Sequence, residues 1–194
     1  MNTARNDRLQ KKILEGVRLT GTPSPEELVG TPGWPSEERM HQGPVAVIEC
    51  VEKIPCNPCE TACPLRAISV GEDITALPVL NEAKCTGCGV CVASCPGLAI
   101  YVKDYTFEEE RGSILFPFEY LPLPKKGDTV QMTDRFGEVV CPGEVLLVNL
   151  SRRNEQTALV KAAYDKKFFL EVVSMKRLSR PRADHRDTGA EAFP

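Results

Sequence analysis

The stretch Cys85-Thr-Gly-Cys-Gly-Val-Cys-Val-Ala-Ser-Cys-Pro96 sets the architecture of this chain. Its four cysteines have the spacing C-x2-C-x2-C-x3-C-P, which is typical of a segment that binds a [4Fe–4S] cluster. Cys85, Cys88 and Cys91 can reach one cluster from a tight turn, whereas Cys95 points to a neighbouring cluster. The two glycines within the stretch allow backbone amides to approach the cluster sulfides closely. The spacing therefore predicts one iron–sulfur site with a second site beside it.

A related pattern occurs earlier in the chain, as Cys56-Asn-Pro-Cys-Glu-Thr-Ala-Cys-Pro64, and its three cysteines correspond to the last three of the first pattern. The same correspondence places Lys53 at the position equivalent to Cys85, and lysine cannot bind iron. The nearest thiol is Cys50, and a longer loop from Cys50 to Cys56 costs little, because loop-closure entropy changes slowly with length. We therefore expect Cys50 to be the displaced ligand. A three-iron cluster, a non-cysteine ligand, a ligand from a partner protein and a Cys50 that is simply buried remain alternatives.

Residues 45–103 resemble the bacterial two-cluster ferredoxin domain, which consists of two pseudo-symmetric βαβ-like halves. The resemblance implies two [4Fe–4S] clusters, one of them held by Cys63, Cys85, Cys88 and Cys91. The other would be held by Cys56, Cys59, Cys95 and, in place of the missing ligand, Cys50. The segment 54–64 also resembles the ferredoxin subunits that accompany FAD-dependent amino-acid dehydrogenases of the proline/hydroxyproline type.

The composition is that of an ordinary soluble protein, with 194 residues, 42% hydrophobic and 26% charged. A net charge of −3 favours neither nucleic acid nor a membrane as a partner. The first residues are polar with no apolar region behind them, and no run approaches the roughly 18 apolar residues of a membrane span. Cysteines at metal-binding spacing in such a chain indicate the reducing cytoplasm.

Zinc is the alternative metal, because paired C-x2-C motifs also form zinc ribbons. Zinc sites rarely combine three cysteines in one turn with a following Cys-Pro, so the spacing favours iron–sulfur clusters. Cys141 stands alone in the segment Cys141-Pro142-Gly143, where we expect a turn with a buried structural thiol and not a ninth ligand.

The expected fold class is α+β, a ferredoxin-like domain with an N-terminal arm and a small C-terminal all-β barrel or sandwich. The predicted regions are a helix and Pro/Gly-rich docking arm (1–44), the two-cluster domain (45–104), a proline-rich apolar bridge (105–126), a β-rich domain (127–178) and a basic tail (179–194).

The flanks of the cluster segment also carry local signals. Residues 5–19 have helical spacing, residues 24–28 can form one helical turn with Pro25 at its first position, and residues 44–50 form a strand. Residues 114–123 are apolar but interrupted by prolines, so we expect them to stay out of the sheet and to cover the domain or a partner. Trp34 either anchors the N-terminal connector or contacts a partner.

Beneath the clusters we expect an apolar floor, formed by Ile68, Val70, Ile100 and Val102. Residues 45–104 carry seven acidic and four basic side chains, and this negative charge tends to lower cluster potentials.

The predicted function is electron transfer. Neither of the two histidines, His41 and His185, has a nucleophile beside it, so catalysis by this chain alone is not expected. The resemblance implies a hetero-oligomer with an FAD-containing dehydrogenase subunit that oxidises proline, hydroxyproline or a D-amino acid, which a small [2Fe–2S] subunit can accompany. The alternatives are a free-standing ferredoxin, the iron–sulfur subunit of a different redox complex, and a redox- or zinc-dependent regulator, for which no DNA-reading element is visible.

Overall fold

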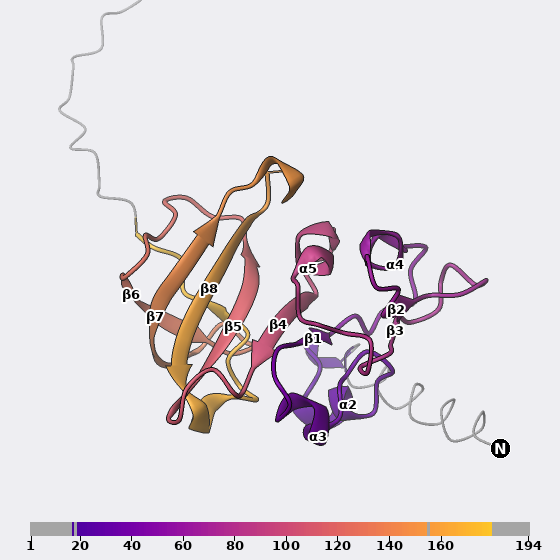
Figure 1. The fold of residues 1–194 in the computed structure, drawn as a ribbon, viewed down its shortest axis with the longest axis horizontal. Helices are drawn as coiled ribbons and strands as arrows, with labels where there is room; N and C mark the ends of the chain where they lie inside the picture. The colour runs from indigo at the N-terminus through magenta and orange to yellow at the C-terminus, as the bar shows by residue number, and fades with distance from the viewer. Residues whose placement is uncertain (1–16, 18, 155, 180–194) are drawn as a thin grey trace, which may run out of the picture.

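The computed structural model describes residues 17, 19–154 and 156–179 (Figure 1). The predicted helix over residues 5–19 and the basic tail therefore lie almost wholly outside the described residues. The helical elements are α2 (Pro25–Val29), α3 (Glu37–Met40), α4 (Pro58–Ala62), α5 (Val90–Ser94) and the 3-10 turns η1 (Arg152–Asn154) and η2 (Lys166–Phe168). The strands are β1 (Val45–Ile48), β2 (Ile68–Ser69), β3 (Val79–Leu80), β4 (Ile100–Asp104), β5 (Arg111–Phe118), β6 (Thr129–Thr133), β7 (Val139–Asn149), β8 (Ala158–Asp165) and β9 (Ser174–Met175).

Seven strands form one antiparallel sheet in the order β1-β4-β5-β8-β7-β6-β9, and β2 pairs with β3 in a separate hairpin. The sheet runs without interruption from β1 and β4 into the strands that follow residue 110 (Figure 1). In the described residues β1 and β9 are its two edges and do not pair, so the predicted barrel is not closed. The structure is mixed, with mostly sheet and few short helices.

Strands β1 and β4 form a wall between two hydrophobic cores. One core lies between this wall and the later strands and includes Val45, Val47 and Tyr101. The other lies on the opposite face and includes Ala46, Ile48, Ile100 and Val102, together with Cys59 and Cys91. Because side chains alternate across a strand, burial on both faces requires a continuous apolar run, and all four residues of β1 are buried.

The expectation that residues 114–123 stay out of the sheet is wrong for the first part of this segment. Strand β5 lies between β4 and β8, and Pro117 is opposite Leu159 of β8. The pairing of β5 with β4 ends at Leu115, so β5 has a neighbour on only one side at Pro117. A residue without an N–H group is tolerated there, because it need not complete a ladder on both sides.

The expected turn at residues 141–143 is also wrong, because this segment lies within β7. Pro142 is opposite Gln131 of β6, and the pairing of β7 with β8 begins only at Gly143. A Cβ atom at Gly143 would lie 2.6 Å from Sδ of Met132. The glycine is therefore required by close packing within the sheet and not by a turn.

The N-terminal connector is fastened to both sheets. Helix α2 begins with the predicted proline, and Ser24 and Glu27 form a capping box around it. The carbonyl oxygen of Gly33 accepts a hydrogen bond from the Ile48 amide (3.1 Å), and that of Pro32 accepts one from the Leu80 amide (2.9 Å).

Trp34, next in the chain, is half-buried and packs against the core that contains Val45 and against the small cluster of Val17, Leu28 and Val51. These contacts support its interpretation as an anchor of the connector.

Candidate functional site

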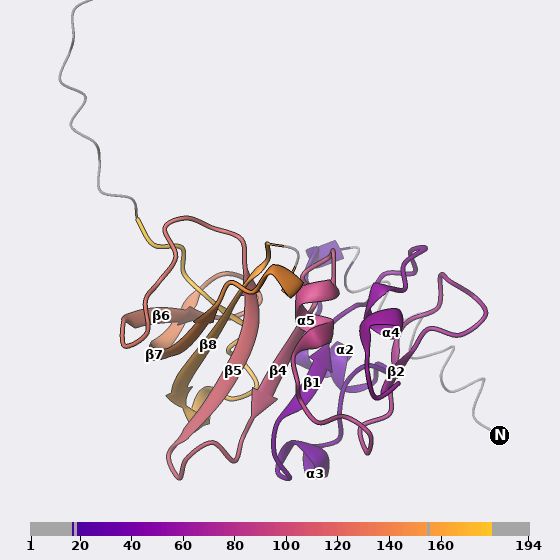
Figure 2. The same cartoon turned by 45° about the horizontal axis from the view of Figure 1, so that its top comes forward.

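The cysteine repeat of the sequence is also a repeat of structure. Helices α4 and α5 occupy equivalent positions of the repeat, lie side by side, and end at Cys63 and Cys95 respectively (Figure 1 and Figure 2). Three residues after each of these cysteines, Arg66 and Leu98 both have positive φ angles, of 50° and 52°. Strands β2 and β4 then begin at equivalent positions. Non-glycine residues rarely adopt positive φ, so its occurrence at equivalent positions shows that the two halves share one backbone design.

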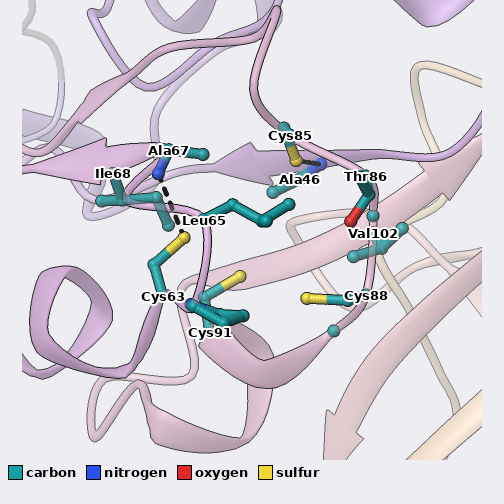
Figure 3. Close-up of a pocket in the computed structure, with 13 residues that line it drawn as sticks. Ala46, Cys63, Leu65, Ala67, Ile68, Cys85, Thr86, Cys88, Cys91 and Val102 are labelled. Carbon is teal, nitrogen blue, oxygen red and sulfur yellow. Dashed lines mark hydrogen bonds between the residues drawn. The ribbon is translucent and has the colours of Figure 1, made fainter.

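One set of four cysteines surrounds a hollow between the two halves, and we call it site 2. Its members are Cys63, Cys85, Cys88 and Cys91. Figure 3 shows their thiol groups turned toward a shared space, with Cys63 coming from the end of α4, Cys85 and Cys88 from the segment before α5, and Cys91 from α5 itself. Ala46 of β1 and Val102 of β4 form part of the wall. The structure thus brings together the three cysteines of one half and one from the other.

The other set of four cysteines lines a separate hollow, and we call it site 1. Its members are Cys50, Cys56, Cys59 and Cys95. Cys50 follows β1 closely in the chain, Cys59 lies on α4, and Cys95 comes from the end of α5. The Cys56 amide donates to the carbonyl oxygen of Ile74 (3.2 Å), which fixes the loop. Cys50 thus lines the same hollow as the three other thiols, although the repeat alone would place a ligand at Lys53.

Among the described residues, backbone amides donate hydrogen bonds to the sulfur atoms of Cys63, Cys85 and Cys95. The Ala67 amide lies 3.2 Å from Sγ of Cys63, and the Ala99 amide lies 3.4 Å from Sγ of Cys95, again at equivalent positions of the repeat. The Ala46 amide of β1 lies 3.4 Å from Sγ of Cys85. Such bonds stabilise thiolate sulfur and, in iron–sulfur proteins, influence the potential of the bound cluster.

Gly87 and Gly89 are both required by the backbone of site 2. Their φ angles are +66° and +82°, in the left-handed region that other residues avoid. A Cβ atom at Gly87 would lie 2.6 Å from Cβ of Pro44, and one at Gly89 would lie 2.5 Å from Cδ2 of Leu115. The segment between Cys85 and Cys91 therefore packs directly on the residue that precedes β1 and on a side chain of β5.

The thiols are suited to binding a cation. Burial raises the pKa of Cys91 to about 12, and the other thiols of site 2 add to the rise. In site 1, burial raises the pKa of Cys59 to about 11 and also raises the pKa of Cys50, with the neighbouring thiols as further causes. Ionising a thiol in these buried surroundings costs free energy unless a positive charge is bound. The cysteines are therefore better suited to bind a metal than to act as nucleophiles.

The predicted apolar floor is largely confirmed. Ile68, Ile100 and Val102 belong to the same core cluster as Cys59 and Cys91. Val70 is buried but lies outside this cluster. The sulfur atoms are thus covered on the inner side by aliphatic side chains.

Cys141 is buried in the other core, on β7, and lines neither hollow. Its burial agrees with the prediction of a structural thiol. The sequence analysis missed Arg39, Glu49 and Arg135, which contact the segments that carry Cys50 and Cys85. No spacing or periodicity marks these residues, because each contact joins segments that are far apart in the sequence.

Part of the chain is similar to known iron–sulfur proteins. Residues 78–101 match the 4Fe–4S binding domain family. The chain is 39% identical over 72 residues to the polyferredoxin-like subunit of an aliphatic sulfonate oxidoreductase from Pyrococcus furiosus, a match that covers 33% of this chain and 39% of the relative. It is 47% identical over 50 residues to one subunit of an ion-translocating oxidoreductase complex from Methanosarcina acetivorans, covering 26% of this chain and 18% of the relative.

A third relative is a subunit of the F(420)H(2) dehydrogenase from Methanosarcina mazei, with 28% identity over 97 residues, 48% of this chain and 55% of the relative. The chain thus spans less than two thirds of the length of each of these relatives. No solved structure matches the chain significantly. In the described part of the chain, no helix is long and apolar enough to cross a bilayer. The matches and the thiol sites together mean that the chain contains a ferredoxin-type domain that binds an iron–sulfur cluster.

Proposed function

We propose that this chain is the electron-transfer subunit of an oxidoreductase complex and that it holds two [4Fe–4S] clusters. The ligands would be Cys63, Cys85, Cys88 and Cys91 in site 2, and Cys50, Cys56, Cys59 and Cys95 in site 1. The observation that carries the proposal is the division of eight thiols into two hollows of four. The cysteine spacing, with three thiols in one turn and a following Cys-Pro, favours a multi-iron cluster over a single zinc ion.

Each part of the chain around the sites has a role in this function. The cysteines supply thiolate ligands, and the amides of Ala46, Ala67 and Ala99 donate hydrogen bonds to ligand sulfur atoms. The aliphatic floor excludes water from the inner side of the sites. The bound clusters supply the one-electron chemistry. The cytoplasm is the proposed location, because free thiols persist there until a cluster is bound.

The proposed partner is an FAD-containing dehydrogenase that oxidises proline, hydroxyproline or a D-amino acid, in a hetero-oligomer that can include a small [2Fe–2S] subunit. The resemblance of residues 54–64 to the ferredoxin subunits of such enzymes supports this partner. The names of two relatives, subunits of an oxidoreductase complex and of a dehydrogenase, support assembly into a larger complex. Ile54 at site 1 and Leu65 at site 2 are 50% and 45% exposed, so each hollow has an apolar rim that a partner can cover.

Metal analysis of protein isolated without oxygen tests the proposal. We expect about eight iron and eight sulfide per chain, because each site offers four thiolates to a cubane cluster. The absorption spectrum should show broad thiolate-to-iron bands that bleach on reduction. Stoichiometric zinc, or a constant content of only one cluster, would contradict the proposal.

A further inference from the structure

Arg39, near the end of α3, holds the segment that carries Cys85. Its guanidinium donates to four carbonyl oxygens, those of Glu82 (3.1 Å), Gly43 (3.1 Å), Pro44 (2.9 Å) and Cys85 (2.7 Å). One side chain thus joins the residue that precedes β1 to the first cysteine of site 2. Among the described carboxylates none forms an ion pair with it, so Arg39 brings an unpaired positive charge next to site 2.

A second contact fixes α3 on the same segment. Ser36 caps α3 by accepting a hydrogen bond from the Arg39 amide (3.1 Å). Its own amide and hydroxyl donate to the carboxylate of Glu82, at 2.6 and 2.8 Å. Arg39 is therefore preorganised, and its guanidinium group loses little conformational entropy when it binds the carbonyl oxygen of Cys85.

Arg135, in the turn between β6 and β7, contacts the residue that precedes Cys50 of site 1. Its Nε and Nη2 donate to the carboxylate of Glu49, which precedes Cys50, at distances of 2.6 to 3.0 Å. Nη1 donates to the carbonyl oxygen of Leu170 (3.1 Å), and the hydroxyl of Tyr101 donates to the same carboxylate of Glu49. The side chains of Arg135 and Glu49 are only 5% and 12% exposed. Removing one partner from such a buried pair leaves an uncompensated charge.

We propose that Arg39 and Arg135 are positioning residues, one for each site, that hold Cys85 and Cys50 in the conformations in which they bind iron. The inference rests on the proposed function, because it concerns the geometry of the proposed ligands. Neither arginine lies within residues 45–104, so each cluster depends on a residue supplied by a flanking part of the chain. Site 2 depends on the segment before the domain, and site 1 depends on the sheet after it.

A variant of each arginine serves as the control for the other, because each is expected to affect a different cluster. Arg39→Gln and Arg135→Gln are made in the full chain, isolated without oxygen, and both clusters are followed by EPR during a redox titration. Cys50→Ser identifies the signal that belongs to site 1. Arg39→Gln should lower the potential of the site 2 cluster alone, because it removes positive charge beside the thiolates. Arg135→Gln should lower the potential of the site 1 cluster alone, because it leaves Glu49 unpaired, and should convert part of that cluster to a three-iron form in air.

The conservative variants separate positioning from charge. Lysine keeps the charge but cannot reproduce the planar, multiply bonded guanidinium, so Arg39→Lys and Arg135→Lys should restore much of the potential but neither the wild-type EPR line shape nor the wild-type stability of the cluster in air. Arg111→Gln, which breaks an exposed ion pair with Glu108 and Glu144, should change neither cluster. The unaffected cluster in each variant reports that the chain is folded.

Unchanged potentials in both glutamine variants, equal shifts of both clusters, or full rescue by lysine would overturn the inference. Wild-type protein that lacks two clusters would instead overturn the proposed function on which the inference rests.

Discussion

Lys103 donates a hydrogen bond from its ammonium group to the main-chain carbonyl oxygen of Phe169, inside the core formed by the seven-stranded sheet. The residue is only 1% exposed, and the ring centroids of Tyr101 and Phe169 lie 5.4 and 5.1 Å from its nitrogen. The aromatic faces and one carbonyl replace only part of the hydration that the ammonium group loses.

Lys103→Met should therefore stabilise the protein in a pH-dependent way. Burial lowers the pKa of Lys103 from 10.5 to about 7; Arg135 adds to this effect, and Glu49 and Glu171 oppose it. Below pH 7 the full cost of the buried charge is present, and it disappears as the pH rises toward 10.5, because the unfolded chain then binds more protons than the folded one. The variant should raise the free energy of unfolding by about 1–3 kcal/mol at pH 6, with a smaller gain at pH 9.

Urea unfolding followed by circular dichroism without oxygen measures this difference. Lys167→Met serves as the control, because the ammonium group of Lys167 is exposed, in an ion pair with Asp165 and over the ring of Phe168. A Lys103→Met protein that is equally destabilised at both pH values would contradict the prediction.

Cys50→Ser should damage one cluster and leave the other intact. Cys50 lines site 1 with three further thiols, and serine is a poorer ligand for iron than cysteine. We expect lower iron content and a changed EPR signal for a single cluster. Cys141→Ser should keep the full iron content and cost about 1 kcal/mol of stability, since it introduces a hydroxyl into a core. Retention of both clusters with unchanged potentials in Cys50→Ser would show that Cys50 is not a ligand.

Gly89→Ala should affect site 2 more strongly than the strain of a positive φ angle alone would predict. Gly89 directly precedes α5, and a new Cβ atom there would collide with Leu115 of β5, so we expect a loss of about 2–3 kcal/mol and a changed site 2 signal. Gly127→Ala is the matched control, because Gly127 has a similar φ of +88° with nothing within 4 Å of its Cβ position. It should cost about 1–2 kcal/mol and leave both clusters unchanged. Equal effects of the two substitutions would show that the contact with Leu115 is unimportant.

The partner should dock on the apolar rims of the two hollows. Tagged protein purified from its own cells should carry a flavoprotein, detected by FAD fluorescence and gel filtration. Ile54→Glu or Leu65→Glu should weaken that association about tenfold, because an apolar contact is replaced by a charge. Val139→Glu, at a position that is 43% exposed on β7, is the control and should bind normally. A monomeric chain that exchanges electrons freely with many soluble acceptors would favour the free-standing ferredoxin.

The sequence was most informative for features that depend on residues close together in the chain. The cysteine spacing and the constant offset between the two halves indicate the two thiol segments and the apolar floor, because these depend on residues close together in the chain. The grouping of the thiols is what the resemblance to two-cluster ferredoxins implies. The repeat and the reach of a short loop led to the expectation that Cys50 is the displaced ligand, and Cys50 lines the hollow of site 1, while its binding of iron stays a prediction.

Features that depend on distant neighbours could not be predicted in this way. Whether Pro117 can lie in a sheet depends on where β4 stops pairing, which no pattern within β5 reveals. Continuity of the sheet across residues 104–111 depends on the pairing of β4 with β5 and of β5 with β8. The contacts of Arg39 and Arg135 join residues 46 and 86 positions apart, so they carry no periodic signal.

The position of Arg135 also bears on how the protein matures. A chain synthesised from its N-terminus has emerged as far as Arg39 and every cysteine of site 2 once Cys91 has left the ribosome. By its proposed role, Arg135 must be present before site 1 is complete, as must the strands that place its guanidinium against Glu49. The proposed roles therefore give cofactor loading an order, in which site 2, which also needs β4 and β5, is complete before site 1. A chain truncated in the segment between β5 and β6 should therefore receive one cluster only.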